Sequence, residues 1–179
     1  MSDDKVPIFA FLGVAGVLAM AACTRQAPPA TVEIIGPCLV IGDSIASRWP
    51  HPGGLGGLYP DCYVNAIVGR PSEDIVKAPP PFRARFTVVS TGSNDHDGKT
   101  YSAAETIRRK LAATRSEPVI WVLPSAAHAS ARSAVEKIAR DHGDATVDFE
   151  AGPDGTHPRS YAALAEGVNA VLKSKGIEP

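Results

Sequence analysis

Short apolar runs alternate with amphipathic stretches along most of the chain. The runs predict five strands, over residues 38–41, 62–68, 86–90, 119–123 and 146–149. The stretches between and after them predict helices over 44–49, 71–78, 102–114, 129–142 and 158–174. Strands that are apolar on both faces are typical of a parallel sheet with right-handed crossovers. We therefore predict one α/β domain with a five-stranded parallel sheet.

Proline and glycine set several of the predicted boundaries. Pro50 ends the helix that starts at Ser44, because proline cannot continue a helix. Residues 51–60 contain Gly-Gly-Leu-Gly-Gly and predict a flexible connection. They do not form a phosphate-binding loop, because no Gly-Lys-Ser/Thr follows them.

The first residues have a different composition from the rest. Residues 6–22 are almost entirely apolar and lead to Cys23, and Met20-Ala21-Ala22 before it looks like a lipobox. We expect residues 1–23 to be a signal peptide with Cys23 lipidated. Met20 and Asp3-Asp4 fit that pattern poorly, so an ordinary signal, an uncleaved anchor and no export all stay open. Residues 24–31 predict a linker, and residues 32–179 predict the folded domain.

Composition narrows the class of protein. The chain has 179 residues and a net charge of −1, so no basic surplus favours nucleic acid. Cys38 and Cys62 precede two predicted strands, and an exported protein would oxidise them to a disulfide if these strands are neighbours. The alternative is a pair of buried thiols.

Polar residues gather where the predicted strands end, and parallel sheets place their sites at that edge. Ser44 follows the first strand in Gly-Asp-Ser and is a candidate nucleophile. His157 is the best of five histidines to serve as its base. Asp154, three residues upstream, can hold the ring in the required tautomer.

The same edge supplies candidate donors for an oxyanion. They are the backbone N–H of Ser44, the backbone N–H of Gly69 and the side-chain amide of Asn94. Gly69 permits close approach to a substrate, and Gly92 does the same for the turn that presents Asn94. No His/Cys/Asp spacing predicts a metal site, and the chemistry requires no cofactor.

These residues form four sequence blocks: Gly42-Asp43-Ser44, Gly69, Gly92-Ser93-Asn94-Asp95 and Asp154-Gly155-Thr156-His157-Pro158. In this order and content the chain resembles the SGNH (GDSL-type) hydrolase family. The resemblance implies a flavodoxin-like three-layer α/β/α sandwich. It also implies a triad of Ser44, His157 and Asp154 and an oxyanion hole of Ser44, Gly69 and Asn94. The family hydrolyses esters and thioesters, including acetyl groups on polysaccharides.

Departures from the family pattern affect the substrate hypothesis. Arg70-Pro71 follows Gly69, where small and hydroxyl residues are commoner, so Arg70 either meets an anionic or sugar group or is a solvated loop residue. His96 is a reserve substrate contact. Short loops favour an open site for a small acyl group on a bulky carrier. We expect an exported, membrane-tethered serine esterase acting on short-chain or O-acetyl esters of cell-envelope glycan. A glycan-binding domain without activity and an acyltransferase are the alternatives.

Overall fold

The computed structural model describes residues 35–36, 38–47, 54–77, 82–96 and 98–179. Within them a sheet of five parallel strands has the order β3-β2-β5-β6-β7. The strands are β2 (Leu39–Gly42), β3 (Tyr63–Ala66), β5 (Thr87–Ser90), β6 (Val119–Val122) and β7 (Ala145–Val147). Counted along the chain this order is 2-1-3-4-5, as in flavodoxin-like folds. The predicted fold class is confirmed.

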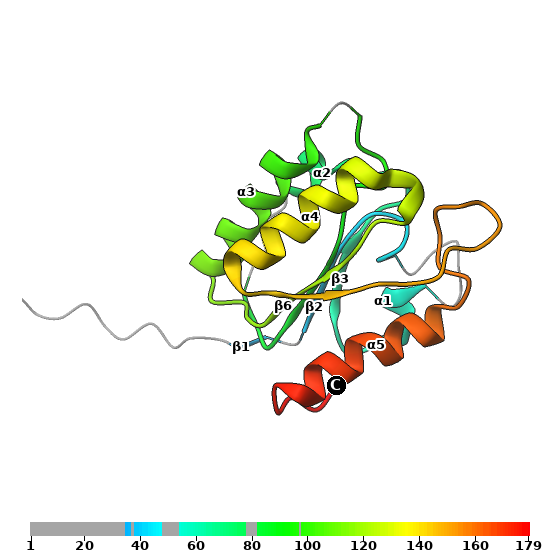
Figure 1. Ribbon diagram of the computed structural model, residues 1–179. Coiled ribbons are helices and arrows are strands. Elements are labelled where there is room, and N and C mark those ends of the chain that lie inside the picture. The colour runs from blue at the N-terminus through cyan, green and yellow to red at the C-terminus, as the bar shows by residue number, and fades with distance from the viewer. Residues whose placement is uncertain (1–34, 37, 48–53, 78–81, 97) are drawn as a thin grey trace, which may run out of the picture. The chain divides into compact units, whose positions relative to one another are not determined.

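Helices cover both faces of the sheet (Figure 1). One apolar cluster joins Val40, Val88 and Ile120 of the strands to α1 (Leu55–Leu58) and α5 (Tyr161–Ser174). The other cluster holds the alternate strand residues, including Ile41, Val89 and Trp121. It packs against α2 (Ser72–Ile75), α3 (Thr100–Ala113) and α4 (Ala129–His142). Because successive residues of a strand face opposite sides, the three central strands are buried throughout.

The carboxyl end of β2 lies very close to β5. A β-carbon placed on Gly42 would lie 2.0 Å from the carbonyl oxygen of Ser90, so only glycine fits at this position. Gly42 pairs with Ala66 on one side and with Ser90 on the other. The segments that follow β2, β3 and β5 therefore leave the sheet side by side.

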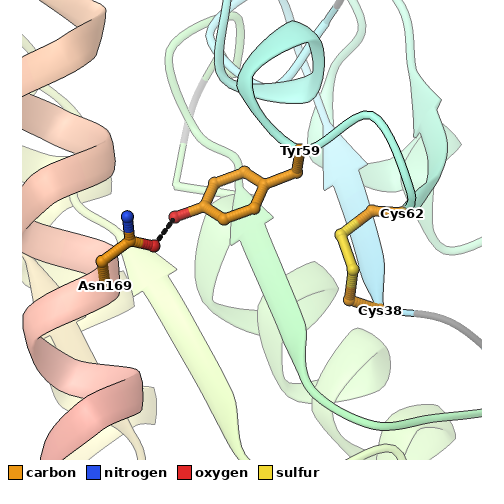
Figure 2. Close-up of a disulfide and its surroundings, with 4 residues drawn as sticks. All are labelled: Cys38, Tyr59, Cys62 and Asn169. Atoms are coloured by element: carbon orange, nitrogen blue, oxygen red, sulfur yellow. Dashed lines mark hydrogen bonds between the residues drawn. A yellow bond between two sulfur atoms is a disulfide. The ribbon is translucent and has the colours of Figure 1, made fainter. Parts of the chain in front are cut away.

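A disulfide closes the amino end of the same two strands. Cys38 and Cys62 directly precede β2 and β3, which pair Leu39 with Tyr63. Their sulfur atoms are bonded and their Cα atoms are 4.5 Å apart (Figure 2). Nearby, the Tyr59 hydroxyl donates to Asn169 Oδ1 at 2.6 Å. This contact attaches the segment between α1 and β3 to α5 (Figure 2).

Two local predictions before β3 are wrong. Of the helix predicted over 44–49, the described residues 44–47 form a turn. Asp43 Oδ1 accepts from the Ile45 N–H, and the Ser47 N–H donates to Ser44 O, so one side-chain bond and one backbone turn bond take the place of helical bonds. Within residues 51–60, where a flexible connection was predicted, α1 forms and buries Leu55 and Gly56. Gly56 fits there because a β-carbon would lie 2.7 Å from Ala46 O.

Other boundaries moved by a few residues. Helix α5 begins at Tyr161 rather than Pro158, because Ser160 Oγ caps it by accepting from the Ala163 N–H. Strands β3 and β7 are shorter than predicted. A small parallel pair, β1 (Ile35–Gly36) with β4 (Arg83–Ala84), and the 3-10 turn η1 (Ala126–His128) were not predicted. Across the described ranges, each helix is too short or too polar to cross a membrane.

Candidate active site

Three side chains from distant parts of the sequence form a hydrogen-bonded chain. His157 Nε2 lies 2.9 Å from Ser44 Oγ, and His157 Nδ1 lies 2.6 Å from Asp154 Oδ2. An ionised carboxylate only accepts hydrogen bonds, so Nδ1 carries the proton and donates it to Asp154. Nε2 is then the acceptor for the Ser44 hydroxyl. This tautomer is the one that a base for Ser44 requires.

The loop between β7 and α5 builds the His157–Asp154 pair locally. Asp154 Oδ1 accepts from the backbone N–H groups of His157 at 2.9 Å and Thr156 at 3.0 Å. The Gly152 N–H donates to His157 O at 2.7 Å, which closes the loop at its base. Ser125 Oγ donates to Gly155 O at 2.5 Å and joins this loop to the segment after β6. The imidazole is therefore held by its own loop and by a neighbouring one.

These contacts also set the charge of Asp154. The backbone N–H of His157 comes first among the groups that lower the Asp154 pKa, followed by the Thr156 N–H and the imidazole. The side chain is 54% exposed, so water adds to this stabilisation of the anion. The carboxyl group is thus ionised throughout the neutral range, as the tautomer assignment requires.

Asp43 shapes the turn that presents Ser44, and the sequence reasoning did not single it out. Its side chain is fully buried, and Oδ1 accepts from Ile45 N at 3.1 Å and from Ser90 Oγ at 2.8 Å. Burial raises the pKa of this carboxyl group, and the Ser90 hydroxyl and the Ile45 N–H oppose the rise. The sequence did offer a signal for this structural role, because Asp43 is a charged residue directly after a fully apolar strand.

Gly69 and Asn94 line one pocket beside Ser44's edge of the sheet. The pocket has a volume of about 230 Å³, and its wall also includes Glu73, His96 and Lys99. Gly69 has a φ of +75°, which favours glycine. The Asn94 amide nitrogen donates to Arg70 O at 3.4 Å. An amide has two N–H groups, so one remains for a ligand.

The other predicted contacts lie differently. The Arg70 guanidinium is turned onto its own loop, where it donates to Asn65 Oδ1 at 3.0 Å and to Asp74 O at 3.1 Å. His96 is exposed at the pocket wall. Of the other histidines, His128 contacts Thr156 and His142 contacts Glu105. Cys23 and His51 lie outside the described residues.

Metal ligands do not cluster in the part of the chain that the structure describes. No three His, Cys, Asp or Glu side chains there lie close enough to hold an ion. The site described above consists of a serine, a histidine and a carboxylate, with glycine and asparagine nearby.

The comparisons with known proteins establish the fold. No family model matches the sequence, and no curated protein does. The structure is similar to the C-terminal catalytic domain of peptidoglycan O-acetyltransferase A from Streptococcus pneumoniae. There the TM-score is 0.56 at 20% identity, over 81% of this chain and 96% of that one.

Two further solved structures have the same fold. For a family two carbohydrate esterase from Cellvibrio japonicus the TM-score is 0.55 at 16% identity, over 82% of this chain and 63% of that one. For a candidate acylhydrolase from Bacteroides fragilis the TM-score is 0.53 at 17% identity, over 78% of this chain and 87% of that one. All three enzymes or candidate enzymes are described as acting on acyl groups or carbohydrate.

Proposed function

We propose that the protein is a serine esterase of the SGNH type that hydrolyses carboxylic esters through an acyl-enzyme. The observation that carries the proposal is the continuous chain of hydrogen bonds from Ser44 through His157 to Asp154. A serine hydroxyl is a weak nucleophile until a base removes its proton. Here the base is in reach, in the right tautomer, and oriented by an ionised carboxylate.

The reaction proceeds in two halves. Ser44 Oγ attacks the ester carbonyl while His157 Nε2 takes its proton, and the resulting imidazolium is stabilised by Asp154. His157 then gives the proton to the leaving alcohol, and the acyl group remains on Ser44. Water enters, His157 accepts a proton from it, and the hydroxyl attacks the acyl carbon. Ser44 recovers its proton as the carboxylic acid leaves.

The negative charge on the carbonyl oxygen needs donors that are already in place. We assign this role to the backbone N–H groups of Ser44 and Gly69 and to the free N–H of the Asn94 amide. Support comes from the register of the sheet, which brings the ends of β2, β3 and β5 together. Support also comes from the pocket that Gly69 and Asn94 share.

The preferred substrates are short-chain or O-acetyl esters on carbohydrate of the cell envelope. A long acyl chain gains about 0.8 kcal/mol for each methylene that it buries against apolar walls. The pocket beside the proposed oxyanion donors has a volume of only about 230 Å³, and Glu73, Lys99 and His96 place polar groups in its wall. Structures of the same fold include a peptidoglycan O-acetyltransferase domain and a carbohydrate esterase, which fits an acetylated glycan.

We further propose that the domain works outside the cytoplasm. Residues 1–23 would be the export signal, Cys23 the site of lipidation, residues 24–31 the tether and residues 32–179 the catalytic domain. The disulfide between Cys38 and Cys62 supports this proposal, because such bonds persist in oxidising compartments. Loss of membrane association in a Cys23→Ala variant, measured by fractionation, tests the lipid anchor.

An acyltransferase is the second candidate, because a sugar hydroxyl could replace water in the second half-reaction. The structural similarity to an O-acetyltransferase domain supports this second candidate. Product analysis with and without a chitooligosaccharide acceptor separates the two activities. Acetylated sugar as the main product would identify a transferase, and free acetate in both reactions would identify a hydrolase.

One experiment tests the proposed function directly. The full chain is treated with a fluorophosphonate probe, the labelled residue is mapped, and p-nitrophenyl esters from acetate to octanoate are assayed. We expect label on Ser44, and turnover that falls as the acyl chain lengthens. A folded protein that takes no label and cleaves no ester would favour a glycan-binding domain instead. Label on another residue would refute the assigned nucleophile.

A further inference from the structure

Asp95 is the centre of a network of hydrogen bonds beside the proposed oxyanion donors. Its Oδ1 accepts from the Ser72 backbone N–H at 2.7 Å. Its Oδ2 accepts from Ser72 Oγ at 2.5 Å and from Thr100 Oγ1 at 2.6 Å. Three donors on one carboxylate form a charge-assisted cluster, and such bonds are about twice as strong as neutral ones.

The direction of these bonds extends the network into the core. Ser72 Oγ also lies 2.5 Å from Thr91 Oγ1. Ser72 has a single hydroxyl proton and gives it to Asp95, so Thr91 is the donor in this pair. Ser72, Thr91 and Thr100 are all buried. Each hydroxyl proton thus has a defined direction, which fixes the rotamers around the carboxylate.

The partners of Asp95 belong to the two segments that present Gly69 and Asn94. Ser72 begins α2, only three positions after Gly69, and Asp95 directly follows Asn94. Thr100 begins α3, which follows the segment that contains Asn94 and Asp95. The two segments meet a second time where the Asn94 amide donates to Arg70 O at 3.4 Å. The Arg70 guanidinium in turn donates to Asp74 O in α2.

We propose that Asp95 is a positioning residue that fixes the separation between the Gly69 N–H and the Asn94 amide. It touches no reacting atom and acts through Asn94 and through the start of α2. This inference rests on the proposed function, because it gives the fixed separation a catalytic use. The carboxylate draws both segments to one point, so the two donors are set before a substrate arrives and need no rearrangement during the reaction.

A carboxylate suits this place better than an amide. Asp95 uses both oxygens as acceptors for three donors, whereas asparagine offers one acceptor oxygen and an NH₂ group. An Asp95→Asn variant keeps the volume and the bond to the Ser72 N–H if its oxygen takes the place of Oδ1. It then places NH₂ opposite the hydroxyls of Ser72 and Thr100. We expect it to retain part of the positioning that Asp95→Ala loses.

The test is a double-mutant cycle with p-nitrophenyl acetate. Removal of one oxyanion donor costs about 10²–10³ in kcat, which we expect for Asn94→Ala. For Asp95→Ala we expect a fall in kcat of about 10–100-fold with KM changed by less than about twofold, because a misplaced donor loses part of that contribution. Asp95→Asn should lie between Asp95→Ala and the unmodified protein. The double variant Asn94→Ala, Asp95→Ala should lose less than the product of the two single losses, because only the effect on the Gly69 N–H remains for Asp95 to exert.

Asp74→Ala is the matched control. Asp74 lies in α2, and its carboxylate pairs only with exposed Lys77 in the contacts described. We expect its kcat to stay within about twofold of the unmodified value. If Asp95→Ala also does so, or if its loss multiplies with that of Asn94→Ala, the inference is wrong. If Asp95→Ala does not fold, the same cycle with Asp95→Asn decides the question.

Hydrogen exchange provides a readout that does not depend on turnover. The Ser72 N–H donates to Asp95 and is protected from exchange by this bond. Peptides covering residues 66–72 and 91–96 should therefore exchange faster in Asp95→Ala, whereas their exchange rates in Asp74→Ala should equal those of the unmodified protein. Equal exchange in both variants would overturn the inference even in an inactive protein. An unmodified chain without esterase activity or label would refute the proposed function. The hydrogen-exchange rates would still show whether Asp95 holds the two segments in place.

Discussion

The two ends of the sheet are held by different kinds of interaction. At the amino end, a disulfide joins the residues before β2 and β3. There too, Arg108 of α3 donates to Asp144 and Glu117, which precede β7 and β6. At the carboxyl end, Ser44, Asn94 and His157 lie on turns held by hydrogen bonds of neighbouring side chains and backbone. The covalent and buried ionic contacts are thus remote from the candidate chemistry.

This division predicts that the two ends fail in different ways when altered. Changes at the amino end should lower the free energy of unfolding and leave the reaction of each folded molecule intact. Changes at the carboxyl end should remove activity and leave most of the stability. The variants below test this division, from the largest expected effect to the smallest.

Ser44→Ala should reduce ester turnover by at least about 10⁴-fold, because the loss of one triad member disables the whole unit. Its melting temperature should stay close to that of the unmodified protein, since only one hydroxyl is removed. Steady-state kinetics and thermal melting measure the two quantities. Turnover that persists in the variant would mean that another group is the nucleophile.

Arg108→Ala should lower the free energy of unfolding by about 3–5 kcal/mol, because it leaves a buried charge unpaired. The side chains of Arg108 and Asp144 are only 7% and 5% exposed, and the Trp121 Nε1–H also donates to Asp144. Arg109→Ala is the control, because Arg109 is the next residue of the same helix and is exposed. Urea titration of both variants should separate them, while kcat per folded molecule stays constant. Similar losses in the two variants would contradict a special role of the buried pair.

Replacement of Cys38 and Cys62 by serine should cost about 3 kcal/mol, the chain entropy that a loop of this length returns to the unfolded state. The sequence separation of the two residues is 24. Chemical denaturation with and without a reducing agent measures the effect in the unmodified protein. Esterase activity that fell as steeply as stability would break the separation between the two ends.

The smallest expected effect is a loss of stability at acid pH. The folded-state pKa of Asp154 is lowered, so its contribution to stability is complete above the unfolded pKa of about 3.9 and is lost as the pH falls through the folded value. The stability difference between the unmodified protein and Asp154→Asn should therefore shrink as the pH falls below about 4. Denaturation curves at several pH values measure it. A difference that grew below about pH 4 would reverse the assigned sign.

The sequence predicts the sheet well because its strands are buried on both faces. A run such as Val119–Val122 has few alternatives to a central strand, and α4 begins and ends at the residues predicted from its apolar spacing. The predictions around Ser44 and Leu55 failed for a physical reason. The Asp43 carboxylate captures the Ile45 N–H, a local bond that competes with the helix. Gly56 packs closely on Ala46, and this tertiary contact does not follow from local propensity.

In the candidate site, too, some contacts could be predicted from the sequence and others could not. Asp154 and His157 are three residues apart, so their pairing could be inferred from spacing alone. The role of Asp95 could not be inferred, because its partners Ser72 and Thr100 meet it only once α2 and α3 are in place. Arg70 illustrates the reverse case. Its charge suggested a substrate contact, whereas its guanidinium is taken up by Asn65 and by the backbone of Asp74.

The spacing of the triad along the chain has a consequence for biosynthesis. The contact between Ser44 and His157 spans 113 positions, whereas His157 and Asp154 come from one loop near the carboxyl terminus. A ribosome-bound chain that ends before this loop carries its serine without a base. Under the proposed mechanism such a chain cannot cleave esters, and activity begins only after the loop that carries Asp154 and His157 has emerged and docked. Reaction of Ser44 with a fluorophosphonate would therefore report completed assembly of the whole domain.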